Sequence, residues 1–171
     1  MNLLKTTRTE KFLVHYQRNN LILDFLLYTG LRVSELVNIK YSDYQTNNYT
    51  NSLKVLGKGN KIRYICIPNF LTKYFNTKKH GYLFTNLRGK KLLTKQVQRI
   101  IRIRVAKSGI NKSITPHTFR RSFATLLNKS EVRLTTIQQL LGHTDVNTTV
   151  AYIHHSYEEI YEDYSKLWKN R

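Results

Sequence analysis

The chain has 171 residues, with 29 Lys and Arg against 10 Asp and Glu, which gives a formal net charge of +19 at pH 7. Its hydrophobic content of 40%, with 12 Tyr and 7 Phe, suffices for the core of one domain and excludes a disordered basic tail. The single cysteine, Cys66, excludes an internal disulfide and a cysteine-rich zinc site, as is typical of proteins in a reducing cytoplasm.

The positive charge lies in the body of the chain. Residues 158–171 hold four acids and three bases, which leaves 26 bases and 6 acids in the first 157 residues. This balance predicts nucleic acid as the partner, with binding that weakens steeply as salt rises. Composition alone is also compatible with a protein tuned for solubility or for anionic lipid. The apolar run at residues 21–28 is interrupted by Asp24 and is too short to span a membrane, so we expect a cytoplasmic protein at the nucleoid.

The N-terminal part predicts three helices. Thr7 and Glu10 have the spacing of a capping box, which indicates that a first helix begins there. A second helix is predicted over residues 21–28 and should stop at Gly30. The third follows at once, and its core face consists of Val33, Leu36 and Val37.

A β-hairpin is predicted next. Residues 53–56 and 61–67 are short segments rich in β-branched and aromatic residues, and the GKGN segment at 57–60 separates them. Glycines can adopt positive φ at such a turn, and Pro68 ends the second strand. Lys58 would then lie at the tip of the hairpin.

Helical patterns return in the second half of the chain. One helix is predicted near residues 71–75 and a longer one over residues 94–107. The buried side of the longer helix should consist of Val97, Ile100, Ile101 and Val105.

Three more helices complete the prediction. Thr115 and Pro116 mark the start of a helix that should run to about Asn128. A short helix should end at Gly142, and another should carry Tyr152. The predicted fold class is therefore mainly α with one small antiparallel β-sheet (α+β).

The helix that begins at Pro116 has two unlike sides at 100° per residue. The side expected to anchor it in the core consists of Phe119, Phe123 and Leu126. The opposite side presents His117, Arg120 and Ala124. An imidazole and a guanidinium group would then point into the same space. Spacing alone leaves open that this side is an ordinary solvated face.

Two further charged positions have a simple alternative. Arg32 lies in a turn between two predicted helices, three residues before Glu35, and the pair could form an intrahelical salt bridge. Lys58 could reach into a groove of bound DNA or could only add solubility at the hairpin tip. Neither position decides the function by itself.

Five segments together resemble a known family. They are TGLRVSEL at residues 29–36, GKGNK at 57–61, HTFRRSFAT at 117–125, LLGH at 140–143, and Tyr152 nine residues later. In this order and proportion they resemble the catalytic domain of tyrosine recombinases, a family that includes phage integrases and Xer-type recombinases. The resemblance covers nearly the whole chain.

The resemblance implies how the phosphodiester bond would be broken. Tyr152 would attack the scissile phosphate to give a 3′-phosphotyrosyl link and a free 5′-hydroxyl, and the phenolate can leave again without ATP. Arg32 and Arg120 would clamp the two non-bridging oxygens, because a planar guanidinium fork matches phosphate geometry.

The other motif residues take supporting roles. Lys58 would protonate the departing 5′-oxygen, His117 would act as acid or base near the tyrosine, and His143 would hydrogen-bond a phosphate oxygen. Glu35 would hold a histidine or Arg32 in place. His154 and His155 stand beside Tyr152 and could compete for the acid–base role. The sequence has neither P-loop spacing nor short-range metal-ligand spacing, so we expect no cofactor and no metal.

The C-terminal residues predict an amphipathic stripe of Ile160, Tyr164, Leu167 and Trp168. This stripe could pack on its own domain. In the family reading it would dock on a neighbouring protomer, within a tetrameric synapse on double-stranded DNA. Without DNA the protein is expected to self-associate weakly or to be monomeric.

The leading hypothesis is a site-specific DNA recombinase or integrase. Residues 1–171 are expected to form its catalytic domain without the N-terminal DNA-binding domain that most members carry, so recombination by this chain alone should be poor or absent. One alternative is a catalytically silent DNA-binding remnant or regulator. A relaxing topoisomerase of similar mechanism (type IB-like) is a third possibility.

Overall fold

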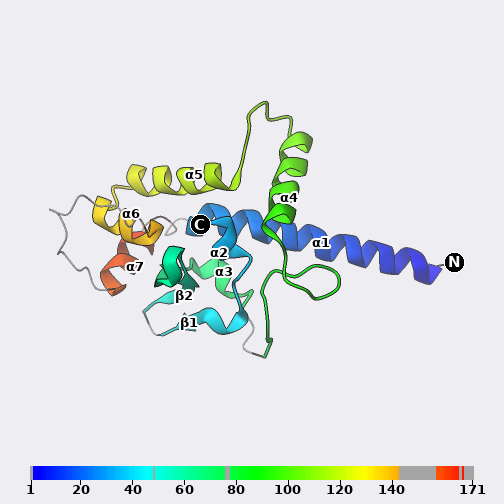
Figure 1. The fold of residues 1–171 in the computed structure, drawn as a ribbon, viewed down its shortest axis with the longest axis horizontal. Coiled ribbons are helices and arrows are strands. Elements are labelled where there is room, and N and C mark those ends of the chain that lie inside the picture. The colour runs from blue at the N-terminus through cyan, green and yellow to red at the C-terminus, as the bar shows by residue number, and fades with distance from the viewer. Residues whose placement is uncertain (1, 48, 76–77, 143–156, 166, 168–171) are drawn as a thin grey trace.

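The computed structural model describes residues 2–47, 49–75, 78–142, 157–165 and 167, without the side chains of residues 2–13, Lys58 and Tyr157. It is mainly helical with one three-stranded antiparallel sheet, as predicted (Figure 1). The helices are α1 (Asn2–Thr29), α2 (Val33–Leu36), α3 (Asn69–Thr72), α4 (Thr94–Lys107), α5 (Pro116–Lys129), α6 (Leu134–Leu141) and α7 (Tyr157–Ser165). In the described part of the chain, no helix has both the length and the apolar character that a membrane span needs.

Helix α1 replaces the first two of the three helices predicted for the N-terminal part. The residues between the two predicted helices, 17–20, contain neither Pro nor Gly, so nothing in the backbone ends the first helix there. Tertiary contacts hold this stretch, because Arg18 donates to the Thr85 carbonyl at 2.9 Å and Asn20 accepts from Arg104 at 2.6 Å. The N-terminal half of α1 extends away from the rest of the molecule (Figure 1).

The sheet contains the predicted hairpin and one strand more. Strand β2 (Asn51–Leu56) pairs antiparallel with β3 (Ile62–Cys66), with Leu53 opposite Ile65. Of the two turn glycines, Gly59 has a positive φ of 70° and Gly57 does not, at −87°. The three-residue strand β1 (Tyr44–Thr46) was not predicted and pairs with β2.

One core cluster joins α1, the sheet and α4. Helix α4 has the predicted bounds, and Val97 and Ile101 on its inner side are buried. Leu36 and Val37, in and just after α2, are buried in the same cluster. This cluster fixes the turn from α1 to α2 against the hairpin, and both carry residues of the predicted site.

Helix α5 is rotated relative to the prediction, which was right that Phe123 is buried and wrong about Leu126 and Arg120. The buried residues on α5 are Pro116, Arg120, Phe123 and Leu127, whereas Leu126 is 38% exposed. The core-facing direction therefore runs between the two predicted sides, because the buried Arg120 finds carbonyl partners there. His117, one turn earlier, is exposed.

A second core cluster lies where α5, α6 and α7 meet. Ile160 and Tyr164 of α7 are 8% and 1% exposed, and they pack in a cluster with Phe123 and Leu141. The Tyr164 hydroxyl donates to the Tyr28 carbonyl at 2.7 Å. The described part of the C-terminal stripe thus packs on its own domain, and Trp168 lies outside the described residues.

This packing gives a stability prediction. Tyr164→Ala should lower the free energy of unfolding by about 3–5 kcal/mol, since it empties a buried aromatic site. Urea denaturation monitored by circular dichroism measures the loss. Tyr49→Ala is the control, because Tyr49 is 78% exposed and its loss should change stability by no more than about 0.5 kcal/mol. Equal midpoints for the two variants would mean that α7 does not pack on its own domain in solution.

Candidate active site

Arg32 is placed by the turn between α1 and α2. Helix α1 ends at Thr29, Gly30 takes φ +61°, and Leu31 is fully buried beneath the turn. Arg32 is the N-cap of α2, and its backbone N–H donates to Glu35 Oε2 at 2.8 Å, as in the carboxylate half of a capping box. Its Nη1 donates to Glu35 Oε1 at 3.0 Å. The predicted pairing of Arg32 with Glu35 is therefore present.

Glu35 also binds a second arginine, Arg63 of β3. Arg63 Nη2 donates to Glu35 Oε2 at 2.8 Å. The side chain of Glu35 is only 2% exposed, against 32% for Arg32 and 14% for Arg63. A buried carboxylate is stable only when it is paired and hydrogen-bonded, and here two guanidinium groups supply both.

Arg120 enters the same region from α5. Its side chain lies on the buried face of the helix, and the residue is 8% exposed. Nη1 donates to the Gly30 carbonyl at 2.6 Å, and Nη2 donates to the Leu141 carbonyl. Each of these nitrogens carries two N–H groups, so each keeps one for another acceptor.

The three arginines converge on the C-terminus of α6. The carbonyls of three consecutive residues each accept from a different arginine: Leu140 from Arg63 at 2.7 Å, Leu141 from Arg120, and Gly142 from Arg32 at 3.3 Å. The last carbonyls of a helix lack intrahelical partners and form the negative end of its dipole, so they attract cations. We call Arg32, Arg63, Arg120 and Glu35 the arginine cluster.

The electrostatics of the cluster favour an anion. Burial, followed by the neighbouring charges of Arg32 and Arg63, lowers the pKa of Arg120 to about 10 although Glu35 opposes the change. Burial also lowers the pKa of Arg63, while Glu35 raises it. Three arginines and one glutamate give the cluster a formal net charge of +2. A phosphate placed here would meet preorganised N–H donors and positive charge.

The remaining predicted site residues are only partly placed. His117 lies on the first turn of α5, one turn before Arg120, with an exposed side chain. The backbone of Lys58 lies in the turn between β2 and β3, and its side chain lies outside the described parts. His143 and Tyr152 lie outside the described residues, as do His154 and His155.

Arg63 is the cluster residue that sequence reasoning missed. It stands in the strand sequence IRYIC, where a positive charge next to apolar residues looks like an ordinary solvent-facing position. The available signal is weak: an arginine within a short strand that otherwise consists of apolar and aromatic residues. Its contacts, to positions 28 and 77 residues away in sequence, follow from tertiary structure alone.

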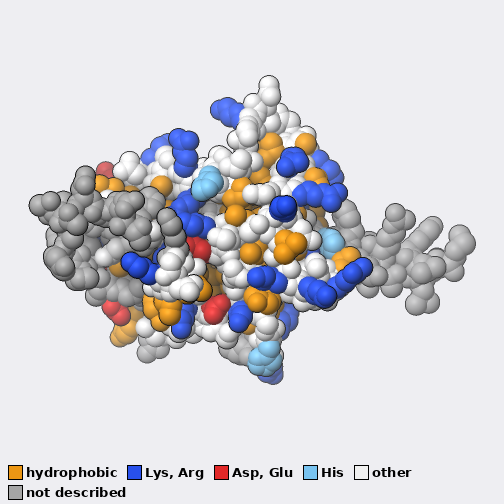
Figure 2. Space-filling view, viewed as in Figure 1, with side chains coloured by type: hydrophobic (Ala, Val, Ile, Leu, Met, Phe, Trp, Pro, Cys, Tyr) orange, Lys and Arg blue, Asp and Glu red, His pale blue; other side chains and the backbone are white. Residues whose placement is uncertain are grey.

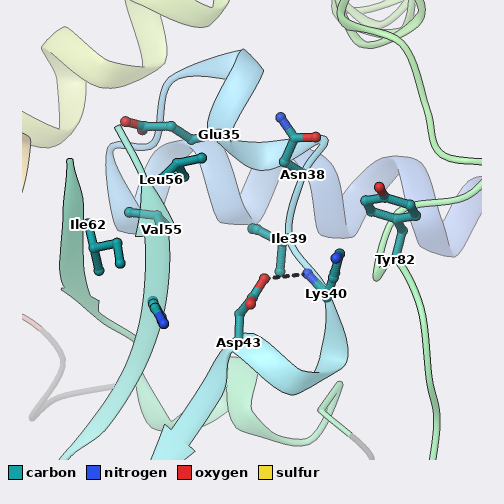
Figure 3. A pocket seen from close by; sticks show the side chains of 10 residues that line it. Glu35, Asn38, Ile39, Lys40, Asp43, Val55, Leu56, Ile62 and Tyr82 are labelled. Atoms are coloured by element: carbon teal, nitrogen blue, oxygen red, sulfur yellow. Dashed lines mark hydrogen bonds between the residues drawn. The ribbon is translucent and has the colours of Figure 1, made fainter. Parts of the chain in front are cut away.

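A cavity of about 490 Å³ adjoins the cluster without containing it. It lies between α2 and β2, and Glu35 lines its edge together with Asn38, Lys40 and Tyr82 (Figure 3). None of the three arginines lines it, and the backbone N–H of Lys40 donates to Asp43 on its floor at 2.8 Å. Its lining mixes lysines with carboxylates, so it lacks the positive balance of the cluster.

The surface around these elements is basic. On the face shown in Figure 2, Lys and Arg side chains are spread over much of the described surface, and Asp and Glu are few. A broad positive surface attracts a polyanion over a distance, whereas the cluster can hold one phosphate in a fixed geometry.

Comparisons with known proteins found similar sequences. A family model described as the phage integrase family matches residues 2–159, which include all three arginines. The tyrosine recombinase XerD of Staphylococcus saprophyticus is 36% identical over 96% of this chain and 59% of the relative. The tyrosine recombinase XerC of Leptospira interrogans is 39% identical over 87% of this chain and 50% of the relative. The chain thus spans between half and three-fifths of the length of these relatives.

The fold is also similar to solved structures. One is the XerH site-specific recombinase bound to the palindromic difH substrate in a post-cleavage complex. The match has a TM-score of 0.66 and 26% identity, and it covers 85% of this chain and 44% of that chain. The similarity therefore holds for both the sequence and the spatial arrangement of the helices and the sheet.

Proposed function

This chain belongs to the phage integrase family, and we propose that it is the catalytic domain of a site-specific recombinase that cleaves and rejoins double-stranded DNA. The two relatives named above are tyrosine recombinases, and the similar solved structure is a site-specific recombinase bound to its DNA substrate. The basic surface (Figure 2) supports action on DNA, and we place the protein in the cytoplasm, at the nucleoid.

The observation that carries this proposal is the convergence of Arg32 and Arg120. They come from α2 and α5 and donate to the carbonyls of adjacent residues, Gly142 and Leu141. Two guanidinium forks this close, each with N–H groups left over, suit the two non-bridging oxygens of one phosphate. A DNA-binding remnant without activity would need neither the convergence nor the cost of burying Arg120.

The proposed reaction uses the motif residues as follows. The hydroxyl oxygen of Tyr152 forms a bond to phosphorus, its proton passes to His117, and the bond between phosphorus and the 5′-oxygen breaks. Lys58 supplies a proton to that 5′-oxygen, and His143 donates a hydrogen bond to the phosphate. Arg32 and Arg120 stabilise the charge that develops on the non-bridging oxygens. The phosphotyrosyl link keeps the bond energy, so religation needs no ATP.

We also propose that subunits assemble as a tetramer only on DNA. The part of α7 that could bridge protomers is already buried within its own domain, and the Tyr164 hydroxyl donates a hydrogen bond to the Tyr28 carbonyl. This packing supports weak association in the absence of DNA.

A covalent trap tests the function. The protein is incubated with a pooled library of nicked duplexes whose sequence is randomised around the scissile phosphate. The wild type should form an adduct stable to denaturing electrophoresis, and Tyr152→Phe should form none, because only the phenolic oxygen can attack. Tyr49→Phe, at an exposed position, is the matched control and should form the adduct at the wild-type rate. DNA binding without any adduct would instead support the silent remnant.

A further inference from the structure

Arg63 holds two partners that lie far apart in the sequence. Its Nη2 donates to Glu35 Oε2 at 2.8 Å, and its Nη1 donates to the Leu140 carbonyl at 2.7 Å. The first contact reaches α2, and the second reaches the end of α6. Arg63 therefore ties the hairpin to both elements that Arg32 contacts, since Arg32 bonds Glu35 and Gly142.

Glu35 links Arg63 to Arg32 through hydrogen bonds. One carboxylate oxygen, Oε2, accepts from both the Arg32 backbone N–H and Arg63 Nη2, each at 2.8 Å. The other oxygen, Oε1, accepts from Arg32 Nη1 at 3.0 Å. Because Arg63 fixes the rotation of the carboxylate, it also fixes the position of the Arg32 fork. Without Arg63, the carboxylate loses one of these three hydrogen bonds, and both it and the Arg32 fork are held less firmly.

The end of α6 is shaped around Arg63 as well. Gly142 has φ +61°, and a Cβ at this position would lie 2.7 Å from Arg63 Cδ and Nε. Gly142 is also the residue whose carbonyl accepts from Arg32. The stem of Arg63 thus packs against the residue that holds the second terminal nitrogen of Arg32.

Burying an arginine at this place carries a desolvation cost, which its terminal nitrogens offset by bonding Glu35 and the Leu140 carbonyl. Among the described residues, its Nε is buried without a hydrogen-bond partner. Burial also lowers its pKa. An apolar side chain of similar volume would avoid both costs but would take one arginine partner from the buried Glu35 carboxylate. Sites that break such local rules are commonly functional.

We propose that Arg63 is a positioning residue, which acts through Glu35 and the α6 C-terminus to hold Arg32 in the orientation that binds the scissile phosphate. This role rests on the proposed function. Arg63 itself need not touch the phosphate.

The test compares cleavage of three nicked substrates by the wild type, Arg63→Met, Arg63→Lys and Arg32→Ala. One substrate has an ordinary scissile phosphate. In the other two a neutral methylphosphonate replaces it, with the methyl group in place of one or the other non-bridging oxygen. When the methyl group stands where Arg32 would contact a charged oxygen, the charge that Arg32 neutralises is gone. Arg32 should then be dispensable. A variant that acts through Arg32 should therefore be rescued by the same stereoisomer as Arg32→Ala.

The expected result is a selective loss. Arg63→Met and Arg63→Lys should cleave the ordinary phosphate about 10- to 100-fold more slowly than the wild type at saturating DNA, the range expected when a reacting group is misplaced. On the stereoisomer that rescues Arg32→Ala, they should approach the wild-type rate. Arg18→Met is the matched control, since Arg18 also bonds a backbone carbonyl but lies outside the cluster. It should cleave all three substrates at the wild-type rate.

Other results would overturn the role. Equal losses on all three substrates would mean that Arg63 only stabilises the fold, and an undiminished rate for both Arg63 variants would exclude any role. Arg63→Lys keeps a charge beside Glu35, so it remains informative if Arg63→Met does not fold. If the wild type forms no adduct, the proposed function fails. Arg63 is then judged by titration with inorganic phosphate, which Arg63→Lys should bind about tenfold more weakly; equal binding would reject the role.

Discussion

Replacing Arg120 with lysine is expected to lower the rate of covalent adduct formation by about 10²- to 10³-fold, the usual loss when one preorganised donor to a developing charge is removed. The guanidinium group donates one N–H to the Gly30 carbonyl and one to the Leu141 carbonyl, and it still has N–H groups left for phosphate. An ammonium group has a single nitrogen, so it cannot reach both carbonyls and a phosphate in the same plane. Single-turnover cleavage of the best nicked duplex measures the loss.

The control for this change is the next residue on α5. Arg121 is exposed, and Arg121→Lys makes the same chemical substitution outside the cluster. It should cleave within about twofold of the wild type, since an exposed substitution away from special features has small effects. Thermal melting of both variants shows whether they are folded at the assay temperature. If folded Arg120→Lys cleaved within tenfold of the wild type, Arg120 would not be a phosphate clamp.

Arg120→Lys should also lower the stability of the protein. Lysine at position 120 leaves the Gly30 or the Leu141 carbonyl without its present donor. A buried acceptor that loses its donor costs about 1–3 kcal/mol. The rate must therefore be measured well below the melting midpoint, where the loss of folding and the loss of catalysis separate.

The sequence predicted the central residues of the site but not how they are held. Arg32, Glu35 and Arg120 follow from motifs, and the pairing of Arg32 with Glu35 follows from their spacing on a helix start. Arg63 and the carbonyls of α6 could not be predicted, because these contacts join residues that lie far apart in the chain. No local pattern encodes them. The catalytic roles of all the predicted site residues remain predictions, namely those of Arg32, Lys58, His117, Arg120, His143 and Tyr152.

For the fold, too, local patterns could be predicted and contacts between distant residues could not. Helix α4 has the predicted bounds because its apolar residues repeat with a clear helical period. Helix α5 was misoriented because a hydrophobic pattern places an arginine outside by default, whereas the buried carbonyls of Gly30 and Leu141 draw Arg120 inward. Strand β1 was missed because three half-exposed and exposed residues give no period to recognise.

Gly30→Ala should cause the largest loss of stability among the glycine substitutions in the described part of the chain. Gly30 has φ +61°, and a Cβ there would lie 2.2 Å from Cδ1 of Phe123, a buried ring that cannot move aside. Backbone strain at positive φ and overpacking of the core each cost about 1–3 kcal/mol, so the free energy of unfolding should fall by about 2–6 kcal/mol. Urea denaturation measures it.

Gly109→Ala separates the two causes. Gly109 has φ +69° and nothing within 4 Å of an added Cβ, so its substitution carries the backbone strain alone and should cost about 1–3 kcal/mol. The excess at Gly30 is then the clash with Phe123. Since Phe123 and Arg120 share the buried face of α5, and Arg120 donates to the Gly30 carbonyl, that clash should also slow adduct formation. Equal losses of stability for the two variants would show that α5 yields to the methyl group, and the close packing that seats Arg120 beside Gly30 would not be rigid.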